Sequence, residues 1–502
     1  MPLLPTLVST LTLLVCGGLA AAAAPQEPAP APAPAAIDPA QLATRIGAYL
    51  QAHHTNRQFE GAALVANDGK IVYEGAFGRA NADWGIQNDL DTRFRLGSIT
   101  KQFTAMLVLL LVQEGKLELE APVVRYLPDF AAASGAQVTI HQLLSHTSGI
   151  PRVTERPRWR DELQQHFSVA EFVARFCTGP LEFEPGTGFW HNNTGYYLLG
   201  AIVEAVTGQT YATALRERVL APLQMDDTGC ERSGEVLAKR AIGYELLFGK
   251  RRHAPHTDMG NHFASDGMYS TVRDLWKWDQ ALRSQRLLTG VLAQRMFTRG
   301  ENDQGYGWHV EDRGVWSGSF NVVPTDGAIP GFRTLMGRIP ARGQCIILLG
   351  NSGYWAVSDA ALGIAAILEG RVPEGADQPP AWTLAQTILG EGIEVGLTAL
   401  AKLPASMRQT PRLPAGEVES TIELLGHRLL QQDRVDEAVR LFDFNTRAFP
   451  KSAKRWDSLG EAHRQGGNRQ LALVNFRVAA ELEPWNAAAK AKVERLEKIE
   501  RR

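Results

Sequence analysis

The hydrophobic and polar pattern predicts two β-hairpins that lie far apart in the chain. Gly61 to Ala66 and Lys70 to Phe77 are β-rich runs separated by the turn residues Asn67-Asp68-Gly69, an arrangement typical of a hairpin. Phe332 to Ile339 and Gln344 to Leu349 flank a second turn in the same way. Both ends of one domain therefore contribute antiparallel strands. Helical periodicity dominates between them, with predicted helices at Ile99 to Gln113, Val169 to Phe176 and Gly195 to Val206.

The C-terminal segment carries a repeating pattern of small and large apolar residues. Residues 417–502 resemble two tetratricopeptide repeats, with a capping helix from about Asn486. The matching positions are Leu425, Gly426, Ala438, Phe442 and Pro450, then Trp456, Leu459, Gly460, Ala472, Phe476, Ala479 and Pro484. Residues 371–416 read as a linker and a helical connector from Trp382 to Leu403. The repeats could bind a protein or peptide partner, or they could dock on the preceding domain and stabilise it.

The N-terminus has the pattern of an export signal. Residues 1–24 are apolar, with a hydrophobic centre at Leu11 to Val15 and small residues at Ala20 to Ala24. Residues 25–37 form an Ala/Pro-rich linker, which favours an extended tether. We therefore expect a periplasmic or secreted protein with no stable membrane span. The segment has no Lys or Arg, and a membrane anchor or a lipoprotein signal at Cys16 stays open.

Composition excludes several classes of partner. The 502 residues carry a formal net charge of only −2, and no basic patch indicates nucleic-acid binding. No Cys or His spacing resembles a metal site, and we expect no cofactor. A solvated polar loop is the preferred interpretation of His253, His256 and His262. Three cysteines remain after the signal, which allows at most one disulfide; they are Cys177, Cys230 and Cys345, the last in a buried-strand pattern.

The candidate catalytic motif is Ser98-Ile99-Thr100-Lys101. A serine three residues before a lysine at a helix start places the hydroxyl and the amine on one face, one turn apart. The helix N-terminus stabilises an alkoxide and favours the neutral amine. The pair is therefore a candidate nucleophile with its own base. The helix that follows is strongly apolar, which is an unusual place for an idle lysine.

Further motifs surround this pair, namely Phe94 to Thr104, Glu114 to Leu117, Tyr126 to Pro128, Leu143 to Gly149, Phe183 to Thr187, Asn193 to Gly200, Asp266 to Thr271 and Pro330 to Phe332. Together they resemble the serine β-lactamase-related hydrolases, a family that holds class C β-lactamases, D-Ala-D-Ala carboxypeptidases, D-aminopeptidases and esterases. The resemblance covers residues 38–370. It implies an α+β fold, in which an antiparallel sheet packed by helices stands beside an all-helical lobe, with the site between them.

The resemblance also places two further motifs of the site. His191-Asn192-Asn193 aligns with the family's Tyr-x-Asn, so that His191 replaces the tyrosine as a proton shuttle. Asn193 would hydrogen-bond both Lys101 and a substrate amide. An ordinary imidazole predicts an acidic limb of the rate profile at about pH 6 to 7. The alternative for His191 is a histidine held in a loop by hydrogen bonds.

At the third motif, Thr325-Asp326-Gly327, threonine stands where relatives carry a lysine or histidine. Gly327 would let the strand pass close to the acyl group. The backbone N–H groups of Ala328 and Ser98 would form the oxyanion hole. Because threonine carries no charge, we expect weaker recognition of substrate carboxylates.

These features predict a serine hydrolase that cleaves esters or peptides through an acyl-enzyme on Ser98, with Lys101 and His191 sharing base and acid roles. A true β-lactamase or D-Ala-D-Ala carboxypeptidase is the alternative within the enzyme class. The alternative from another class is a catalytically weak scaffold that binds through the repeats. Trp190, Trp308 and Trp316 are candidates for an apolar acyl pocket, although such residues more often belong to the core.

Overall fold

The computed structural model describes residues 38–130, 135–155, 162–247, 250–310, 323–353, 357–375, 380–402, 415–483 and 487–500. The predicted signal peptide, the Ala/Pro-rich linker and Trp316 lie outside these residues. Among the helices that belong to the described segments, none combines the length and the hydropathy needed to cross a bilayer.

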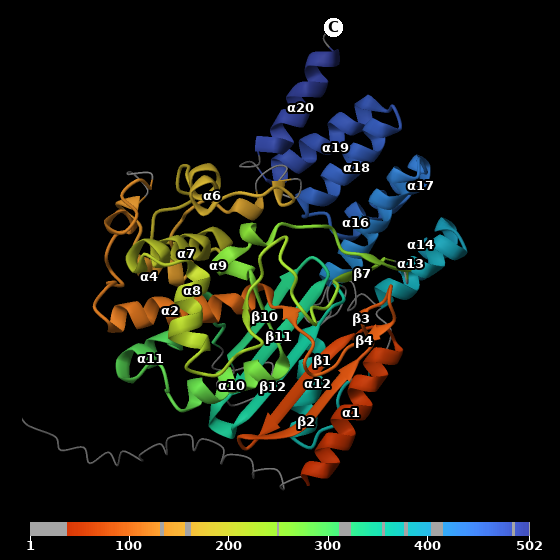
Figure 1. Cartoon of the computed structure of the whole chain (residues 1–502). Coiled ribbons are helices and arrows are strands. Elements are labelled where there is room, and N and C mark those ends of the chain that lie inside the picture. Colours follow the sequence, from red (N-terminus) through yellow and green to blue (C-terminus); the bar gives the residue numbers. More distant parts are fainter. Residues whose placement is uncertain are drawn as a thin grey trace, which may run out of the picture. The chain divides into compact units, whose positions relative to one another are not determined.

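A five-stranded antiparallel sheet joins the two ends of the hydrolase-like domain (Figure 1). Both predicted hairpins are confirmed, and the pairing of β1 with β12, from Gly61 opposite Gly350 to Ala66 opposite Cys345, unites them in one sheet. The strand order is β10-β11-β12-β1-β2, with β1 (Gly61–Asn67), β2 (Lys70–Phe77), β10 (Val323–Ile329), β11 (Phe332–Ile339) and β12 (Gln344–Gly350).

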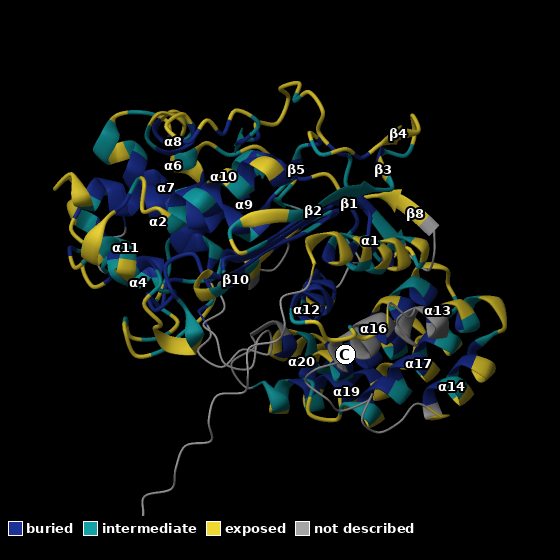
Figure 2. Cartoon of the chain, turned by 90° about the horizontal axis from the view of Figure 1, so that it is seen from below, coloured by how far each residue is buried: buried dark blue, intermediate teal, exposed yellow. Residues whose placement is uncertain are grey.

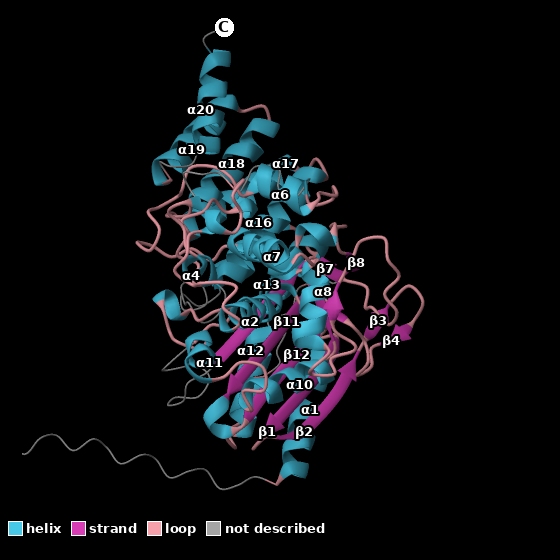
Figure 3. Ribbon diagram, turned by 60° about the vertical axis from the view of Figure 1, so that its left-hand side comes forward, coloured by secondary structure: helices cyan, strands magenta, loops and turns pink. Residues whose placement is uncertain are grey.

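Helices cover both faces of this sheet (Figure 3). Ala63 and Val65 of β1 pack into a core with α1 (Pro39–Thr55) and α12 (Val357–Leu368). Leu64, which points to the opposite face, belongs to the larger core with the remaining helices. Residues 61–66 of β1 are therefore all buried, as in Figure 2, and this explains why β1 is an almost continuous apolar run.

The predicted middle helices are confirmed as α2 (Thr100–Gln113), α6 (Val169–Phe176) and α7 (Asn193–Thr207), with the turn η1 (Gly97–Ile99) ahead of α2. The other helices and single turns are η2 (Val123–Arg125), α4 (Ile140–Leu144), η3 (Val153–Glu155), α8 (Tyr211–Leu215), η4 (Arg216–Leu220), η5 (Met259–Asn261), α9 (Phe263–Asp266), α10 (Val272–Arg283), α11 (Gly290–Met296), η6 (Glu301–Asp303) and η7 (Pro340–Arg342). The short strands are β3 (Arg79–Asn81), β4 (Ile86–Gln87), β5 (Phe94–Arg95), β6 (Gly229–Cys230), β7 (Tyr244–Leu247), β8 (Lys250–His253) and β9 (Met268–Ser270).

The C-terminal part is helical, and its paired helices use small residues where they approach each other. A Cβ at Gly426 would lie 2.4 Å from the Phe442 ring, and one at Gly460 would lie 2.7 Å from Phe476. The predicted connector is two helices separated at Gly392, whose φ is +99°. The assignment to tetratricopeptide repeats stays a prediction. These helices are α13 (Pro380–Gly390), α14 (Ile393–Lys402), α16 (Ala415–Gln431), α17 (Val435–Ala448), α18 (Ala453–Gln465), α19 (Arg469–Leu482) and α20 (Ala487–Glu500).

A buried ion pair links the sheet to the helices behind it. Arg338 of β11 donates from Nε to the Asp279 carboxylate of α10 at 2.5 Å, and the two side chains are 4% and 1% exposed. Arg283 donates to the other oxygen of the same carboxylate at 2.9 Å. Removing one partner of a buried pair leaves an uncompensated charge.

We therefore predict that Asp279→Ala lowers the free energy of unfolding by about 3 to 5 kcal/mol, because it leaves the buried Arg338 without its carboxylate. Glu74→Ala is the matched control, since Glu74 pairs with the half-exposed Arg273 at 2.9 Å and should cost less than about 1 kcal/mol. Urea unfolding measures both. Equal losses in the two variants would contradict the role of this ion pair.

Candidate active site

The turn η1 and the first turn of α2 bring Ser98 and Lys101 together. Lys101 Nζ lies 2.8 Å from Ser98 Oγ, and the lysine is only 2% exposed. Gly97 enters this turn with a φ of +57°, and a Cβ there would lie 2.7 Å from the Ala328 nitrogen. Glycine therefore satisfies both the left-handed backbone and the close approach of β10. The predicted contact between the hydroxyl and the amine is present.

The edge strand β10 passes directly beside Ser98. A Cβ at Gly327 would lie 2.0 Å from the Leu96 carbonyl oxygen, so only glycine allows the observed approach. Thr334 of β11 holds the same carbonyl by donating a hydrogen bond of 2.6 Å. Ala328 is next along β10 and is exposed. Its N–H and that of Ser98 remain our predicted oxyanion donors.

Asp266, at the C-terminal end of α9, is a site residue that sequence reasoning missed. Its Oδ1 lies 2.8 Å from Ser98 Oγ and 3.1 Å from Lys101 Nζ. The side chain is buried, with only 4% of the residue exposed. The motif Asp266 to Thr271 contributed to the family resemblance, but nothing in its spacing showed that the carboxylate reaches Ser98.

For both Lys101 and Asp266, burial and the neighbouring charges shift the pKa in opposite directions. Burial lowers the pKa of Lys101, and the charge of Asp266 only partly opposes that effect. Burial by itself raises the pKa of Asp266, but the charges of Lys101 and His262 and the hydrogen bonds from Ser98 and Lys101 lower it overall. Asp266 is therefore a carboxylate at neutral pH.

The predicted proton shuttle, His191, lies against a second histidine. The rings of His191 and His146 are 4.6 Å apart, and His146 Nδ1 accepts a hydrogen bond from the Asn192 N–H at 3.1 Å. Desolvation and the charge of Lys101 lower the pKa of His191 to about 4. The expected titration at about pH 6 to 7 takes a free imidazole as its reference, and the surroundings of His191 shift that expectation toward lower pH.

A cavity of about 150 Å³ opens beside the nucleophile. Asn193 contributes a buried Oδ1 that has no hydrogen-bond partner in the described residues. The predicted bond from Asn193 to Lys101 is absent from the described contacts, because all three polar contacts of Nζ go elsewhere. A hydrogen bond between Asn193 and a substrate amide stays a prediction. The wall of the cavity includes Asn193, Tyr197, His262, Ser265, Asp266 and Ala328.

The structure separates the three histidines that the sequence placed in one solvated loop. His262 is 9% exposed and bonds Thr257 Oγ1 at 2.8 Å, so its assignment to a solvated loop was wrong. His253 lies 3.0 Å from Asp83, and His256 is exposed. Within the described segments, no cluster of three His, Cys, Asp or Glu residues could hold a metal ion.

The remaining sequence-predicted residues fall outside the reacting cluster. Thr325 Oγ1 donates weakly to the Gly307 carbonyl at 3.4 Å, while the neighbouring Asp326 is exposed. Trp308 is 1% exposed and belongs to the large core, so it does not line an open acyl pocket. Arg152 lies 3.6 Å from the centre of the Trp190 ring, and Trp190 is still 41% exposed. No disulfide joins Cys177, Cys230 and Cys345.

Comparison with known proteins finds relatives of this chain in one family. The Beta-lactamase family model matches residues 46–370. "Esterase EstB" of Burkholderia gladioli is 40% identical over 207 residues, which cover 38% of this chain and 53% of the esterase. The chain thus spans about half the length of that relative. "Putative penicillin-binding protein PbpX" of Bacillus subtilis is 28% identical over 58% of this chain and 70% of its own.

Two solved structures share the fold. A penicillin binding protein from Bacillus halodurans aligns with a TM-score of 0.56 and 28% identity, over 64% of this chain and 98% of its own. The D-amino acid amidase from Ochrobactrum anthropi SV3, solved with D-phenylalanine, aligns with a TM-score of 0.55 and 27% identity, over 65% and 98%. The chain belongs to the Beta-lactamase family, and it has the fold of that family.

We predict that Gly327→Ala lowers kcat/KM by about 100-fold, because the new methyl group must displace β10 from Ser98 and misplacement by about 1 Å has that effect. The free energy of unfolding should fall by about 1 to 3 kcal/mol. Gly353→Ala is the matched control, since among the described residues its Cβ would meet no atom closer than 3.6 Å. Ester kinetics together with urea unfolding test this pair, and wild-type kinetics in Gly327→Ala would contradict the close approach.

Proposed function

We propose that this protein is a periplasmic or secreted serine hydrolase, an esterase or peptidase that cleaves ester or amide bonds through an acyl-enzyme on Ser98. The observation that carries the proposal is the contact of 2.8 Å between Lys101 Nζ and Ser98 Oγ, next to a cavity of about 150 Å³. The Ser98 hydroxyl is hydrogen-bonded to a charged group, and its partner Asp266 lines the cavity. A nucleophile for acyl transfer needs such an arrangement.

The neighbouring residues have roles that suit this reaction. The N–H groups of Ser98 and Ala328 are our proposed donors to the developing oxyanion. The unpartnered Oδ1 of Asn193 is placed to accept a hydrogen bond from a substrate amide. His191 is our proposed relay for protons to and from the leaving group. All of these residues precede residue 330. We propose that the helices from residue 417 onward take no part in the chemical step and instead bind a protein or peptide partner.

The relatives support ester and amide substrates, and they keep a second candidate in view. EstB is an esterase by name, and the amidase was solved with a D-amino acid. The penicillin-binding relatives favour β-lactam or D-Ala-D-Ala substrates as the alternative. A substrate panel with an ester, a cephalosporin and a D-Ala-D-Ala peptide distinguishes the two.

Because Ser98 and Lys101 act as a unit, we predict that Ser98→Ala and Lys101→Ala each lower ester turnover by at least about 1,000-fold, and that the double variant is hardly worse. Labelling with a fluorophosphonate should stop in Ser98→Ala, while the circular dichroism spectrum stays that of the wild type. If Ser98→Ala retained more than about a tenth of the wild-type rate, Ser98 would not be the nucleophile.

The third motif predicts a preference among substrates. Thr325 offers a neutral hydroxyl, and the charge of the exposed Asp326 acts on Arg333, the cross-strand partner of Ala328. A charge-assisted hydrogen bond to a substrate carboxylate is worth about 1.5 to 3 kcal/mol. We expect cephalosporins to be disfavoured relative to neutral esters by about 10- to 100-fold for this reason.

Thr325→Lys should restore part of that loss for cephalosporins and leave neutral esters unchanged. The measurement is kcat/KM for both substrates in both proteins. Efficient cephalosporin turnover by the wild type, or equal effects of the substitution on the two substrates, would show that Thr325 does not set this preference.

A further inference from the structure

The buried carboxylate of Asp266 contacts both Ser98 and Lys101, and the sequence motifs did not predict either contact. One oxygen, Oδ1, is shared by Ser98 Oγ at 2.8 Å and Lys101 Nζ at 3.1 Å. The other oxygen, Oδ2, accepts from Ser265 Oγ at 3.0 Å. Asp266 therefore touches the reacting hydroxyl directly and is itself held in place by its neighbour.

The hydrogen-bond donors and acceptors around Lys101 determine which group receives the Ser98 proton. Lys101 Nζ has three acceptors within 3.1 Å, namely Ser98 Oγ, the Ser265 carbonyl and Asp266 Oδ1. An ammonium has three donors and no acceptor, and a carbonyl or carboxylate oxygen can only accept. All three N–H bonds are thus directed at acceptors, and no nitrogen lone pair remains to take a proton.

The Ser98 hydroxyl then has a single place to donate. Its oxygen accepts from Lys101, so its hydrogen points to Asp266 Oδ1. A neutral Lys101 that accepted this hydrogen would leave the serine oxygen and the carboxylate 2.8 Å apart with no hydrogen between them. That arrangement is repulsive unless Asp266 carries the proton.

We propose that Asp266 is the proton acceptor for Ser98, and that Lys101 remains an ammonium that stabilises the serine alkoxide. The inference rests on the proposed function, because it assigns the proton within the same acyl-transfer site. It reverses the role that the Ser-x-x-Lys spacing predicted for Lys101. Asp266 is a catalytic residue in this scheme, since it contacts the reacting oxygen.

The protons and bonds of the acylation step balance. As Ser98 Oγ forms its bond to the acyl carbon, its O–H bond breaks and the proton moves to Asp266 Oδ1. The carbonyl π pair moves to the carbonyl oxygen, which the N–H groups of Ser98 and Ala328 receive. The proton on Asp266 then passes to the leaving oxygen or nitrogen, directly or through His191, as that group's bond to the acyl carbon breaks.

Deacylation repeats the sequence with water. Asp266 takes a proton from the water molecule whose oxygen attacks the acyl carbon, and it returns that proton to Ser98 Oγ when the acyl group leaves. One ester or amide bond and one water molecule are consumed, and no other reactant is needed.

The proposal fixes the sign of the pH dependence. The reactive form has Asp266 as a carboxylate and Lys101 as an ammonium, so acylation slows as pH falls through the lowered pKa of Asp266. It also slows as pH rises through the lowered pKa of Lys101, whereas a neutral lysine base would accelerate acylation over the same range. The other charged or titratable groups that act on these two residues are His146, His191, His262 and Asp326.

The test uses the full chain with Asp266→Asn, which keeps the size of the side chain and removes its basicity. We expect kcat/KM for a p-nitrophenyl ester to fall by about 100- to 10,000-fold, with KM changed little, since a general base contributes that factor. Asp266→Glu should regain part of the rate. The expected loss applies at every pH from about 5 to 10, because the amide cannot accept the proton.

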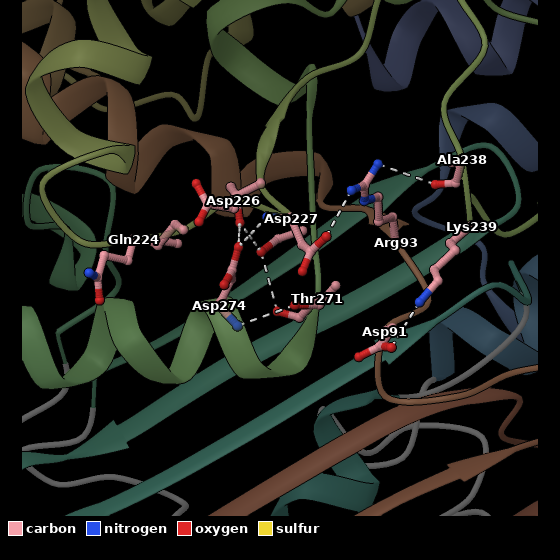
Figure 4. A network of polar contacts seen from close by, with 12 residues as sticks. Asp91, Arg93, Gln224, Asp226, Asp227, Ala238, Lys239, Thr271 and Asp274 are labelled. Carbon is pink, nitrogen blue, oxygen red and sulfur yellow. Dashed lines mark hydrogen bonds and ion pairs between the residues drawn. The ribbon is translucent and has the colours of Figure 1, made fainter.

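Asp274→Asn is the matched control. Asp274 is also a buried carboxylate, 1% exposed, and it belongs to a different polar network (Figure 4). There it accepts hydrogen bonds from the Asp227 N–H and from Thr228, both at 2.9 Å. Its substitution should leave the ester rate within about threefold of the wild type, since it touches no reacting atom.

Three outcomes decide the matter. The proposal is overturned if Asp266→Asn keeps more than a tenth of the wild-type rate. It is also overturned if the rate of Asp266→Asn rises with pH because Lys101 becomes a free base. If Asp266→Asn does not fold, the wild-type pH profile decides: a falling alkaline limb supports the proposal, and a continuous rise contradicts it. The Ser98→Ala variant in the same assay tests the proposed function separately, because only an active Ser98→Ala would refute the acyl-enzyme.

Discussion

The antiparallel pairing of β1 with β12 is the constraint on which the hydrolase domain depends. It joins strands that are more than two hundred residues apart in sequence, and β12 carries β11 and β10 with it. A Cβ at Gly61 would lie 1.9 Å from the Leu349 carbonyl oxygen, so the first residue of β1 must be glycine for the strands to meet. Once this pairing forms, β10 is the edge strand, and its glycine faces the turn that carries Ser98.

The second close approach, between β10 and η1, follows from the first. Gly97 and Gly327 remove the two side chains that would otherwise separate the strand from the nucleophile turn. The result is a narrow, rigid junction in which Ser98 sits at the start of a helix and beside the N–H groups of an edge strand. Such preorganisation is what stabilises a developing oxyanion, because no group has to move when the charge appears.

Taken by themselves, the charges buried at this junction lower the stability of the folded protein. Lys101 and Asp266 are 2% and 4% exposed, and removing both charges from water costs more than an apolar pair of the same size would. The hydrogen bonds to Ser98, Ser265 and the ion pair itself compensate part of that penalty. A cluster of this kind is easier to explain by chemistry at Ser98 than by folding, and two similar proteins, an esterase and an amidase, are hydrolases by name.

The sequence by itself determined the local structure of the chain. The hairpins, the helix after Ser98 and the contact between Ser98 and Lys101 each depend on residues that are close in the chain, where periodicity and turn chemistry report directly on structure. The family resemblance added the motifs at Asn193 and Gly327. Tertiary structure alone decided that Asp266, 168 residues from Ser98, meets its hydroxyl, and that His262 is buried. It also directed Lys101 away from Asn193, because the partner of a buried charge is set by which elements pack together, and spacing along the chain carries no information about that.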